Sequence, residues 1–142
     1  MRVMVIVKAT GDSENESQPI DMKKNAAMFE AMGKFNEELI KAGIMLAGDG
    51  LKPSRFGKRV HFDGTKRSLT DGPFTETKEL VAGFWLWQVR SMDEAVEWAK
   101  RCPNPMPGPS DLELRPLYEP EDFGPEIAAQ EREHLEKIAK RR

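Results

Sequence analysis

A chain of 142 residues is an ordinary size for one domain, and it can bury a core without disulfides or a bound metal. Its 39% hydrophobic and 32% charged residues are typical of a globular protein, not of a disordered or membrane-spanning one. The net charge of -2 lacks the positive excess of a nucleic-acid-binding protein, so we expect no direct contact with DNA or RNA.

The single cysteine and the first residues of the chain bear on the cellular location of the protein. Cys102 has no partner for an internal disulfide. The first residues form a β-like segment and show no basic segment, apolar stretch and cleavage site of a secretory leader. No apolar run reaches the roughly 20 residues that cross a bilayer. We therefore expect a cytoplasmic protein that makes no membrane contact.

The first 43 residues predict a strand, a loop and a long helix. Arg2 to Lys8 places valines on one side and other aliphatic side chains on the opposite side, as in a central strand covered on both faces. The polar stretch from Thr10 to Gln18 predicts a mobile loop. A helix is expected from its N-cap Asp21 to Ala42, with Gly43 as its stop. Its apolar stripe consists of Ala26, Phe29, Met32, Leu39 and Ile40.

The next segment predicts a second strand and a hairpin. Ile44 to Leu51 is the strand, in which the glycines indicate a β-bulge or a close backbone approach, and Pro53 ends it. Arg59 to Phe62 and Lys66 to Leu69 flank Asp63-Gly64, a dipeptide that favours a tight hairpin turn because it tolerates a positive φ.

The remaining elements are two strands and two helices. Leu80 to Val89 is almost continuously apolar and predicts the most buried strand. Ser91, with a glutamate three residues on, forms a capping box for a short helix that ends before Pro103. Asp111 to Leu117 alternates as a half-exposed strand does. Glu126 to about Lys140 predicts a highly charged helix whose large apolar residues are Ile127, Leu135 and Ile138.

This order of elements predicts an α+β fold, the ferredoxin-like split βαβ sandwich with an inserted hairpin. Residues 1–120 form the domain, and residues 121–142 form a charged C-terminal helical extension. Both helices of the domain pack on one face of an antiparallel sheet, so the other face carries uncovered apolar side chains. Because each large aromatic buries about 150–250 Å², we expect a second copy to cover this face in a homodimer.

The most distinctive motif is T-D-G-P-F-T-E-T-K-E, from Thr70 to Glu79. Together with A-G-D-G-L at 47–51, the C-P pair at 102–103, the L-E-L-R-P-L strand and the E-P-E-D-F-G segment, it resembles the YCII-related family. The resemblance is to the subgroup named for the DGPF signature, D-G-P-F-A-E-T-K-E, from which this chain departs by Thr75 in place of alanine. It covers nearly the whole chain.

This resemblance implies a dimeric α+β barrel of ferredoxin-like subunits with a cleft near the dimer interface. It implies no reaction, because relatives by fold include cyclases, isomerases, chlorite-dismutase-like proteins and monooxygenases. Some family members are labelled as transcription-initiation proteins, which makes such a protein a candidate partner here. The wider family is thought to use a His and Asp pair, but this chain has no histidine before His61, so that assignment is not transferred.

The signature loop supplies five candidate site residues, each with a structural alternative. Asp71 is either a turn former, whose carboxylate accepts backbone amide hydrogens, or the catalytic acid of a pocket. Phe74 either lines a cleft or plugs the sheet edge. Glu76, Lys78 and Glu79 are either a polar wall of a ligand site, in which neighbouring charges tune one another's pKa, or solvated surface charges.

Two further candidates lie outside the loop. Arg115 is either the ligand of a substrate carboxylate or part of a structural salt bridge. Asp49 stands between two glycines, which either admit a ligand to the backbone or form a β-bulge. His61 and His134 lack metal-ligand spacing, and Cys102 fits a buried inert thiol better than a nucleophile, so we expect no metal and no cofactor.

Two hypotheses of function follow. The first is a small-ligand-binding homodimer without established catalysis, with a regulatory role. Its C-terminal helix either binds a transcription-initiation partner or wraps the second subunit, because its thin apolar stripe is too weak to stand alone. The alternative is a cofactor-independent enzyme of the isomerase, lyase or cyclase type that uses Asp71 and the other acidic residues of the DGPF loop.

Overall fold

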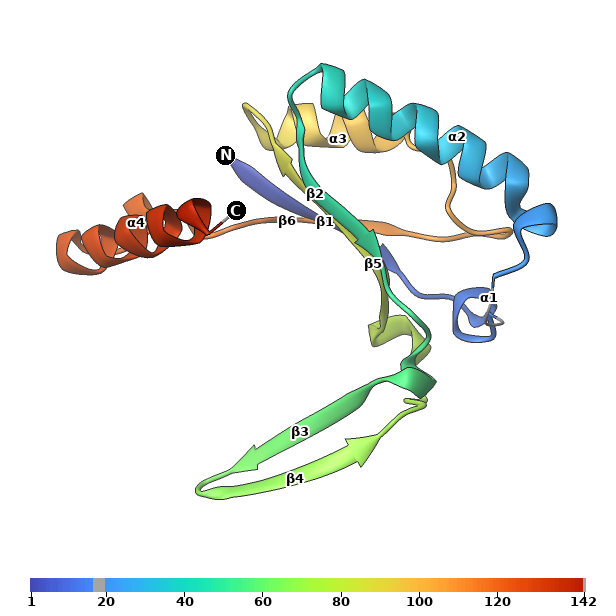
Figure 1. Cartoon of the computed structure of the whole chain (residues 1–142), viewed down its shortest axis with the longest axis horizontal. Helices are drawn as coiled ribbons and strands as arrows, with labels where there is room; N and C mark the ends of the chain where they lie inside the picture. Colours follow the sequence, from blue (N-terminus) through green and yellow to red (C-terminus); the bar gives the residue numbers. More distant parts are fainter. Residues whose placement is uncertain (17–19, 142) are drawn as a thin grey trace.

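The computed structural model describes residues 1–16 and 20–141. One antiparallel sheet has the strand order β2-β5-β1-β6, with β1 (Arg2–Lys8) between β5 (Val81–Gln88) and β6 (Leu112–Pro116), and β2 (Met45–Gly50) at the edge beside β5. Helices α2 (Met22–Lys41) and α3 (Met92–Arg101) cover one face of this sheet (Figure 1). The antiparallel sheet with both helices on one face confirms the predicted α+β fold of the ferredoxin-like type.

The core lies between the sheet and the two helices. It contains the three valines of β1, Trp85 and Trp87 of β5, and Phe35 and Leu39 of α2. The Phe35 ring meets both indoles edge-on, with ring centroids 6.0 and 6.3 Å away. Burying each such side chain contributes about 1.5–3 kcal/mol. Because side chains alternate along a strand, the residues between these core positions project from the opposite face of the sheet.

Helix α2 begins and ends as predicted but turns a different stripe to the core. The Asp21 carboxylate caps it by accepting the amide hydrogens of Lys23 and Lys24, and Gly43 follows its end with a φ of 74°. The predicted stripe is wrong at Ala26, Phe29 and Ile40, because these three residues are exposed. The sheet contacts only the narrow row that contains Met32, Phe35 and Leu39, and Phe35 was absent from the predicted stripe.

The stretch predicted as a mobile loop, Thr10 to Gln18, contains the short helix α1 (Gly11–Glu14). The Thr10 hydroxyl accepts the Ser13 amide hydrogen, and the Ser13 hydroxyl oxygen accepts the Thr10 amide hydrogen at 2.9 Å. This reciprocal capping box stabilises a helical turn that composition alone does not indicate. Residues 17 and 18 of the predicted loop lie outside the described part of the chain.

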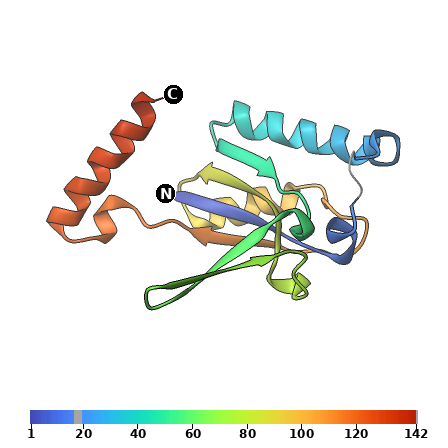
Figure 2. The same cartoon turned by 60° about the horizontal axis from the view of Figure 1, so that its bottom comes forward.

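The predicted hairpin is present as β3 (Lys58–Asp63) and β4 (Lys66–Asp71), which form a separate two-stranded sheet. Asp63 pairs with Lys66, so the turn is Gly64-Thr65 rather than the predicted Asp63-Gly64. Gly64 supplies the positive φ, 61°. Every residue of both strands is exposed, and Figures 1 and 2 show the hairpin projecting from the sheet on the side opposite to α2 and α3.

The C-terminal helix α4 (Pro125–Lys140) also projects from the domain. It packs mainly on the short helix η3 (Pro120–Asp122), against which Ala128 is buried. Figures 1 and 2 place α4 beyond the end of β6, away from α2 and α3. In the described residues, no helix has the length and apolar character to cross a membrane.

Candidate functional site

The face of the sheet opposite to the helices, which we call the open face, is built from two rows of side chains. In the first row the register places Asp49 of β2 opposite Phe84 of β5, Phe84 opposite Ile6 of β1, and Ile6 opposite Glu113 of β6. Ile6 and Phe84 are only half-buried. The row therefore has an apolar middle and an acidic residue at each edge.

The second row lies two residues further along each strand and crosses the four strands in the same order, from β2 to β6. Ala47 lies opposite Leu86, Leu86 opposite Met4, and Met4 opposite Arg115. Met4 and Leu86 are half-buried, and Arg115 is exposed. The Arg115 guanidinium approaches the Glu113 carboxylate of the first row at 3.3 Å. The open face is thus an apolar centre of four large side chains, bounded by charges.

The two candidates on this face, Asp49 and Arg115, lie on opposite edge strands. Three strand spacings of about 4.8 Å separate them, which gives roughly 14 Å. They cannot hold one functional group together. A ligand that contacts either of them extends over the apolar centre.

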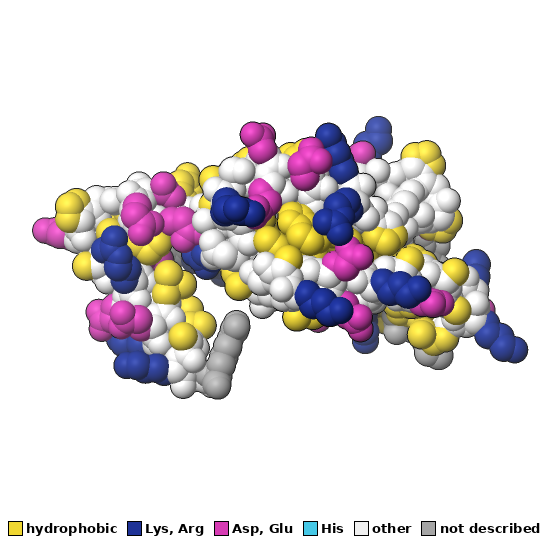
Figure 3. All heavy atoms as spheres, turned by 90° about the horizontal axis from the view of Figure 1, so that it is seen from above, with side chains coloured by type: hydrophobic (Ala, Val, Ile, Leu, Met, Phe, Trp, Pro, Cys, Tyr) yellow, Lys and Arg dark blue, Asp and Glu magenta, His cyan; other side chains and the backbone are white. Residues whose placement is uncertain are grey.

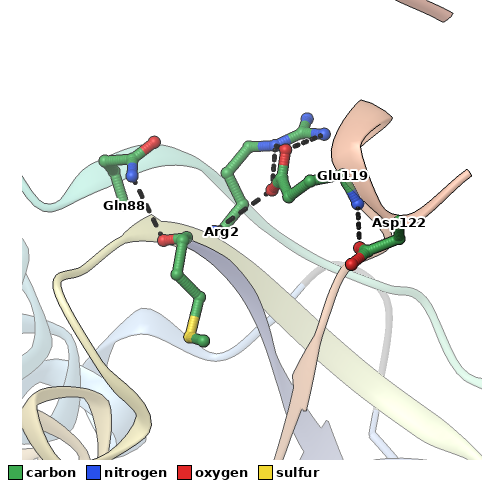
Figure 4. A network of polar contacts seen from close by, with 5 residues as sticks. Arg2, Gln88, Glu119 and Asp122 are labelled. Carbon is green, nitrogen blue, oxygen red and sulfur yellow. Dashed lines mark hydrogen bonds and ion pairs between the residues drawn. The ribbon is translucent and has the colours of Figure 1, made fainter. Parts of the chain in front are cut away.

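A group of polar contacts joins the start of β1 to the segment that follows β6 (Figure 4). The Arg2 guanidinium donates to both carboxylate oxygens of Glu119, at 2.9 and 3.2 Å. The Glu119 amide donates to Asp122 at 2.6 Å, and the Gln88 side-chain amide donates to the Met1 carbonyl oxygen at 3.2 Å. Because the Arg2–Glu119 ion pair is bidentate and half-buried, it fixes the start of the C-terminal segment on β1.

The DGPF loop is held to the domain through Gly72. A Cβ atom on Gly72 would lie 1.8 Å from the Ser54 carbonyl oxygen, so only glycine fits there. The Gly72 amide donates to the Gly57 carbonyl oxygen at 2.9 Å, and the Phe74 amide donates to the Ser54 hydroxyl at 3.0 Å. The peptide bond between Gly72 and Pro73 is cis. Close backbone packing therefore explains the glycine of the signature.

Ser54 also joins this loop to α1. Its amide donates to the Glu14 carboxylate at 3.0 Å, and its hydroxyl donates to the second oxygen of the same carboxylate. The Arg55 guanidinium donates to the backbone carbonyl oxygens of Glu14, at 3.0 Å, and Glu16. We call Glu14, Ser54, Gly72 and Phe74 the loop clasp. It fixes the root of the hairpin to the domain, since Ser54 lies just before β3 and Gly72 just after β4.

The loop candidates lie around this clasp. The Asp71 carboxylate pairs with Lys58 across the hairpin root at 2.6 Å, and both side chains are mainly exposed. The Arg59 guanidinium lies over the Phe74 ring, 3.8 Å from its centroid. Phe74 is half-buried at the hairpin root. These contacts give Asp71 and Phe74 structural partners.

The other three loop candidates, Glu76, Lys78 and Glu79, are exposed in and beside the short helix η2 (Thr77–Glu79). The candidates of the loop and those of the open face therefore lie in two separate places. Sequence reasoning did not identify Glu14 or Ser54, because their contact joins positions 40 residues apart and neither lies in a recognisable motif.

The glycines around Asp49 have a packing role. The register shift of β2 falls between Met45 and Ala47, so the predicted bulge precedes the glycines instead of containing them. A Cβ atom on Gly48 would lie 2.8 Å from the Trp85 ring, which explains the glycine at that position. Asp49 itself is exposed at the sheet edge.

Two open hollows in the described part of the chain lie elsewhere. One, of about 400 Å³, lies where α2 ends and α3 begins, and is lined by residues 42–44 and 88–90 with Glu94 and Trp98. The other, of about 360 Å³, lies at the hairpin tip. Neither contains a candidate residue of the loop or of the open face.

Cys102 ends α3 and is half-buried. Burial raises the pKa of its thiol to about 11, because a thiolate there loses solvation. The thiol donates to the Pro103 carbonyl oxygen at 3.2 Å. It is protonated at neutral pH, in agreement with the predicted inert thiol.

Comparison with known proteins identifies the family. The YCII-related domain matches residues 1–117, which include the whole four-stranded sheet, the hairpin and the loop clasp. The chain belongs to the YCII-related family. In this YCII-related protein, α4 lies beyond the matched region.

Proteins similar to this YCII-related chain include one from Rhizobium meliloti and a dehydrochlorinase of known structure. An uncharacterised protein of Rhizobium meliloti (strain 1021) is 26% identical over 111 residues, which are 77% of this chain and 90% of that protein. The structure of 5-chloro-2-hydroxyhydroquinone dehydrochlorinase (TftG) from Burkholderia phenoliruptrix AC1100, in complex with 2,5-dihydroxybenzoquinone, aligns with a TM-score of 0.46 and 17% identity. That alignment covers 84% of this chain and 95% of the dehydrochlorinase.

Proposed function

We propose that this YCII-related protein is a small-ligand-binding homodimer of the DGPF subgroup. In this proposal the open faces of two sheets lie against each other as a dimeric α+β barrel and enclose a ligand site between them. The D-G-P-F-T-E-T-K-E motif supports the subgroup, and the exclusion of any side chain at Gly72 gives that motif a physical basis.

The apolar centre of the open face carries this proposal. Met4, Ile6, Phe84 and Leu86 adjoin one another across the two central strands, and the helices lie on the other side. A contiguous apolar patch of this kind on a sheet marks a surface that is covered in the working protein. A second copy is the simplest partner for this patch, because a two-fold axis places the same patch of each copy against that of the other.

The charged edges support one ligand class in this proposal. Arg115 offers a guanidinium for bidentate contact with a carboxylate, and the neighbouring apolar centre accepts a ring or an aliphatic chain. Glu113 competes for the same guanidinium at 3.3 Å. The ligand is therefore a small carboxylate with an apolar body, and Asp49 at the far edge accepts a hydroxyl hydrogen from a longer one.

Binding is preferred to catalysis because of the surroundings of Asp71. A catalytic acid works from a cleft that excludes water, whereas the Asp71 side chain is 71% exposed and paired with Lys58. The alternative, an isomerase, lyase or cyclase using the DGPF loop, requires the second copy to enclose that carboxylate. A regulatory role in the cytoplasm, with a transcription-initiation partner, is a further part of the binding proposal.

Sedimentation of wild-type protein and of Phe84→Glu tests the assembly. We expect a dimer for the wild type and a folded monomer for the variant, because the new carboxylate would be buried against its own copy. Lys34→Glu, on the outer side of α2, is the control and should remain dimeric. A wild type that sediments as a monomer at all concentrations contradicts the proposal.

Titration with benzoate tests the site. In amide NMR spectra, benzoate should shift the signals of residues on β1, β5 and β6 next to Arg115. Arg115→Gln should weaken binding about tenfold or more, because the charge-assisted contact is lost. Shifts confined to another surface, or equal affinity of the variant, would count against Arg115 as a ligand.

A further inference from the structure

The hairpin β3–β4 has one apolar face and one polar face. Val60 lies directly opposite Leu69, and Phe62 lies opposite Arg67, so these four side chains share one side of the ribbon. The alternate positions of both strands are polar throughout. Val60, Phe62 and Leu69 are 54%, 66% and 63% exposed. Their exposure is high because the ribbon projects away from the sheet (Figure 2).

Helix α4 also has an exposed apolar stripe. Ile127, Leu135 and Ile138 follow one another at helical spacing, with Glu131 between the first two on the same side. The three apolar side chains are 48%, 37% and 53% exposed. Figure 3 shows hydrophobic side chains along this helix among charged ones.

Neither projection is stable by its own local structure. A two-stranded ribbon in water is marginal, and so is an isolated helix of about 15 residues. In the described part of the chain, the hairpin is fixed at its root by the loop clasp, and α4 is fixed at its start by η3 and the Arg2–Glu119 pair. A partner that covers their apolar faces is needed to hold their far ends.

The charges of the two projections differ in sign. The hairpin, from Lys58 to Asp71, contains four basic residues and two acidic residues; the basic ones are Lys58, Arg59, Lys66 and Arg67. Helix α4 contains four acidic residues, Glu126, Glu131, Glu133 and Glu136, and three basic residues, and the segment before it adds Glu119, Glu121 and Asp122. The near-neutral net charge of the whole chain hides this separation.

We propose that the apolar face of the hairpin in one copy receives the stripe of α4 from a second copy, and that the exchange is reciprocal. The inference rests on the proposed homodimer and adds to it the segments that join the copies. The hairpin projects on the side of the open face, where the second copy lies in that dimer. A single two-fold axis then packs each hairpin on α4 of the other copy, so that the assembly is complete with two copies.

Two double variants test the apolar contact by sedimentation over a range of concentrations. Phe62→Ser with Leu69→Ser removes the apolar face and should raise the dimer dissociation constant at least a hundredfold. His61→Ser with Thr70→Ser changes the polar face of the same strands and should alter it less than threefold. Far-ultraviolet circular dichroism should show the same folded domain in both, because the hairpin lies outside the core.

Charge exchange identifies the occupant. Arg67→Glu should weaken the dimer about tenfold, Glu131→Lys should do the same, and the two together should return the dissociation constant to within threefold of wild type. The combination of Arg67→Glu with Glu136→Lys is the control, because Glu136 lies on the other side of α4, and it should show no recovery.

Each remaining outcome overturns the inference. A wild-type dimer that is indifferent to the Phe62 and Leu69 changes removes the hairpin contact and leaves the open-face dimer intact. Loss of the dimer without recovery in the charge exchange removes α4 as the occupant. Retention of a 20-base-pair DNA duplex by the wild type at 150 mM salt, lost on Arg67→Glu while the dimer is unchanged, would assign the basic ribbon to nucleic acid instead. A wild-type monomer rejects the inference together with the homodimer.

Discussion

The sheet with its two helices and the two projections differ in what holds them. In the sheet region, Trp87 and Leu39 are fully buried and strand pairing is continuous across four strands. The hairpin and α4 keep regular backbone hydrogen bonds but leave their large apolar side chains exposed. Secondary structure and core burial are therefore separable in this chain: the core stabilises the fold, and the projections form regular secondary structure outside it.

A matched pair of leucines should show the largest difference between the two regions. Leu39→Ala in α2 should cost about 2–5 kcal/mol of unfolding free energy, because it leaves a cavity in the core. Leu69→Ala in the hairpin should cost under about 0.5 kcal/mol, because that side chain is exposed. Urea unfolding in the Phe84→Glu background, at a concentration where sedimentation shows a monomer, measures both. Equal costs would show that the hairpin folds as part of the core.

The link between the two regions is tested at Gly72. Gly72→Ala places a methyl group against the Ser54 carbonyl oxygen and should cost about 1–3 kcal/mol, with loss of hydrogen-exchange protection in β3 and β4. Gly57→Ala is the matched control, because its Cβ would lie 3.4 Å from the same oxygen. A hairpin that stays protected in Gly72→Ala would mean that the clasp does not order it.

A smaller effect is expected at the hairpin root. Asp71→Asn removes the ion pair with Lys58, and because both groups are exposed it should cost less than about 1 kcal/mol. Thermal unfolding at low and high salt measures it, and the difference from wild type should shrink at high salt. The same variant serves the enzyme alternative, since lost turnover on an identified substrate would then report chemistry and not unfolding.

The smallest effect at neutral pH concerns Cys102. Its thiol has a pKa of about 11 instead of 9.0, so a disulfide reagent should react with native protein about a hundredfold more slowly than with denatured protein near pH 8. The folded state holds this proton more tightly than the unfolded chain. Its contribution to stability is therefore complete below pH 9 and is lost as the pH rises from 9 to 11. A native thiol that reacts at the denatured rate contradicts this.

Local patterns predicted most of the elements. The alternation in β1 and β5, the Asp21 cap and the Ser91 cap each report a local preference, and the structure confirms them. At the Ser91 cap, the predicted reciprocal bond is different: the Glu94 carboxylate accepts the Arg90 amide hydrogen. The turn was misplaced by one residue because a single glycine, Gly64, fits two registers.

The candidate site also has one part that local sequence patterns predict and one part that they do not. The apolar centre of the open face was predictable, because strand periodicity alone decides which residues share a face. The loop clasp was not, because the Glu14–Ser54 contact depends on how α1 and the hairpin root meet in three dimensions. Asp71 of the DGPF motif stays a prediction as a site residue, whereas the packing of Gly72 against Ser54 could not be predicted from the motif.

The place of the hairpin in the chain has a consequence for protein engineering. Gly50 pairs with Gly83, and the Leu51 amide donates to the Ala82 carbonyl oxygen at 2.8 Å, so the segment from 51 to 80 leaves and re-enters the sheet at neighbouring points. We expect that this segment can be replaced without moving β2 or β5, once the contacts of Ser54 with Glu14 are removed with it. Replacing it with a two-residue turn between β2 and β5 would give a minimal scaffold, onto which foreign recognition loops can be grafted without redesigning the core.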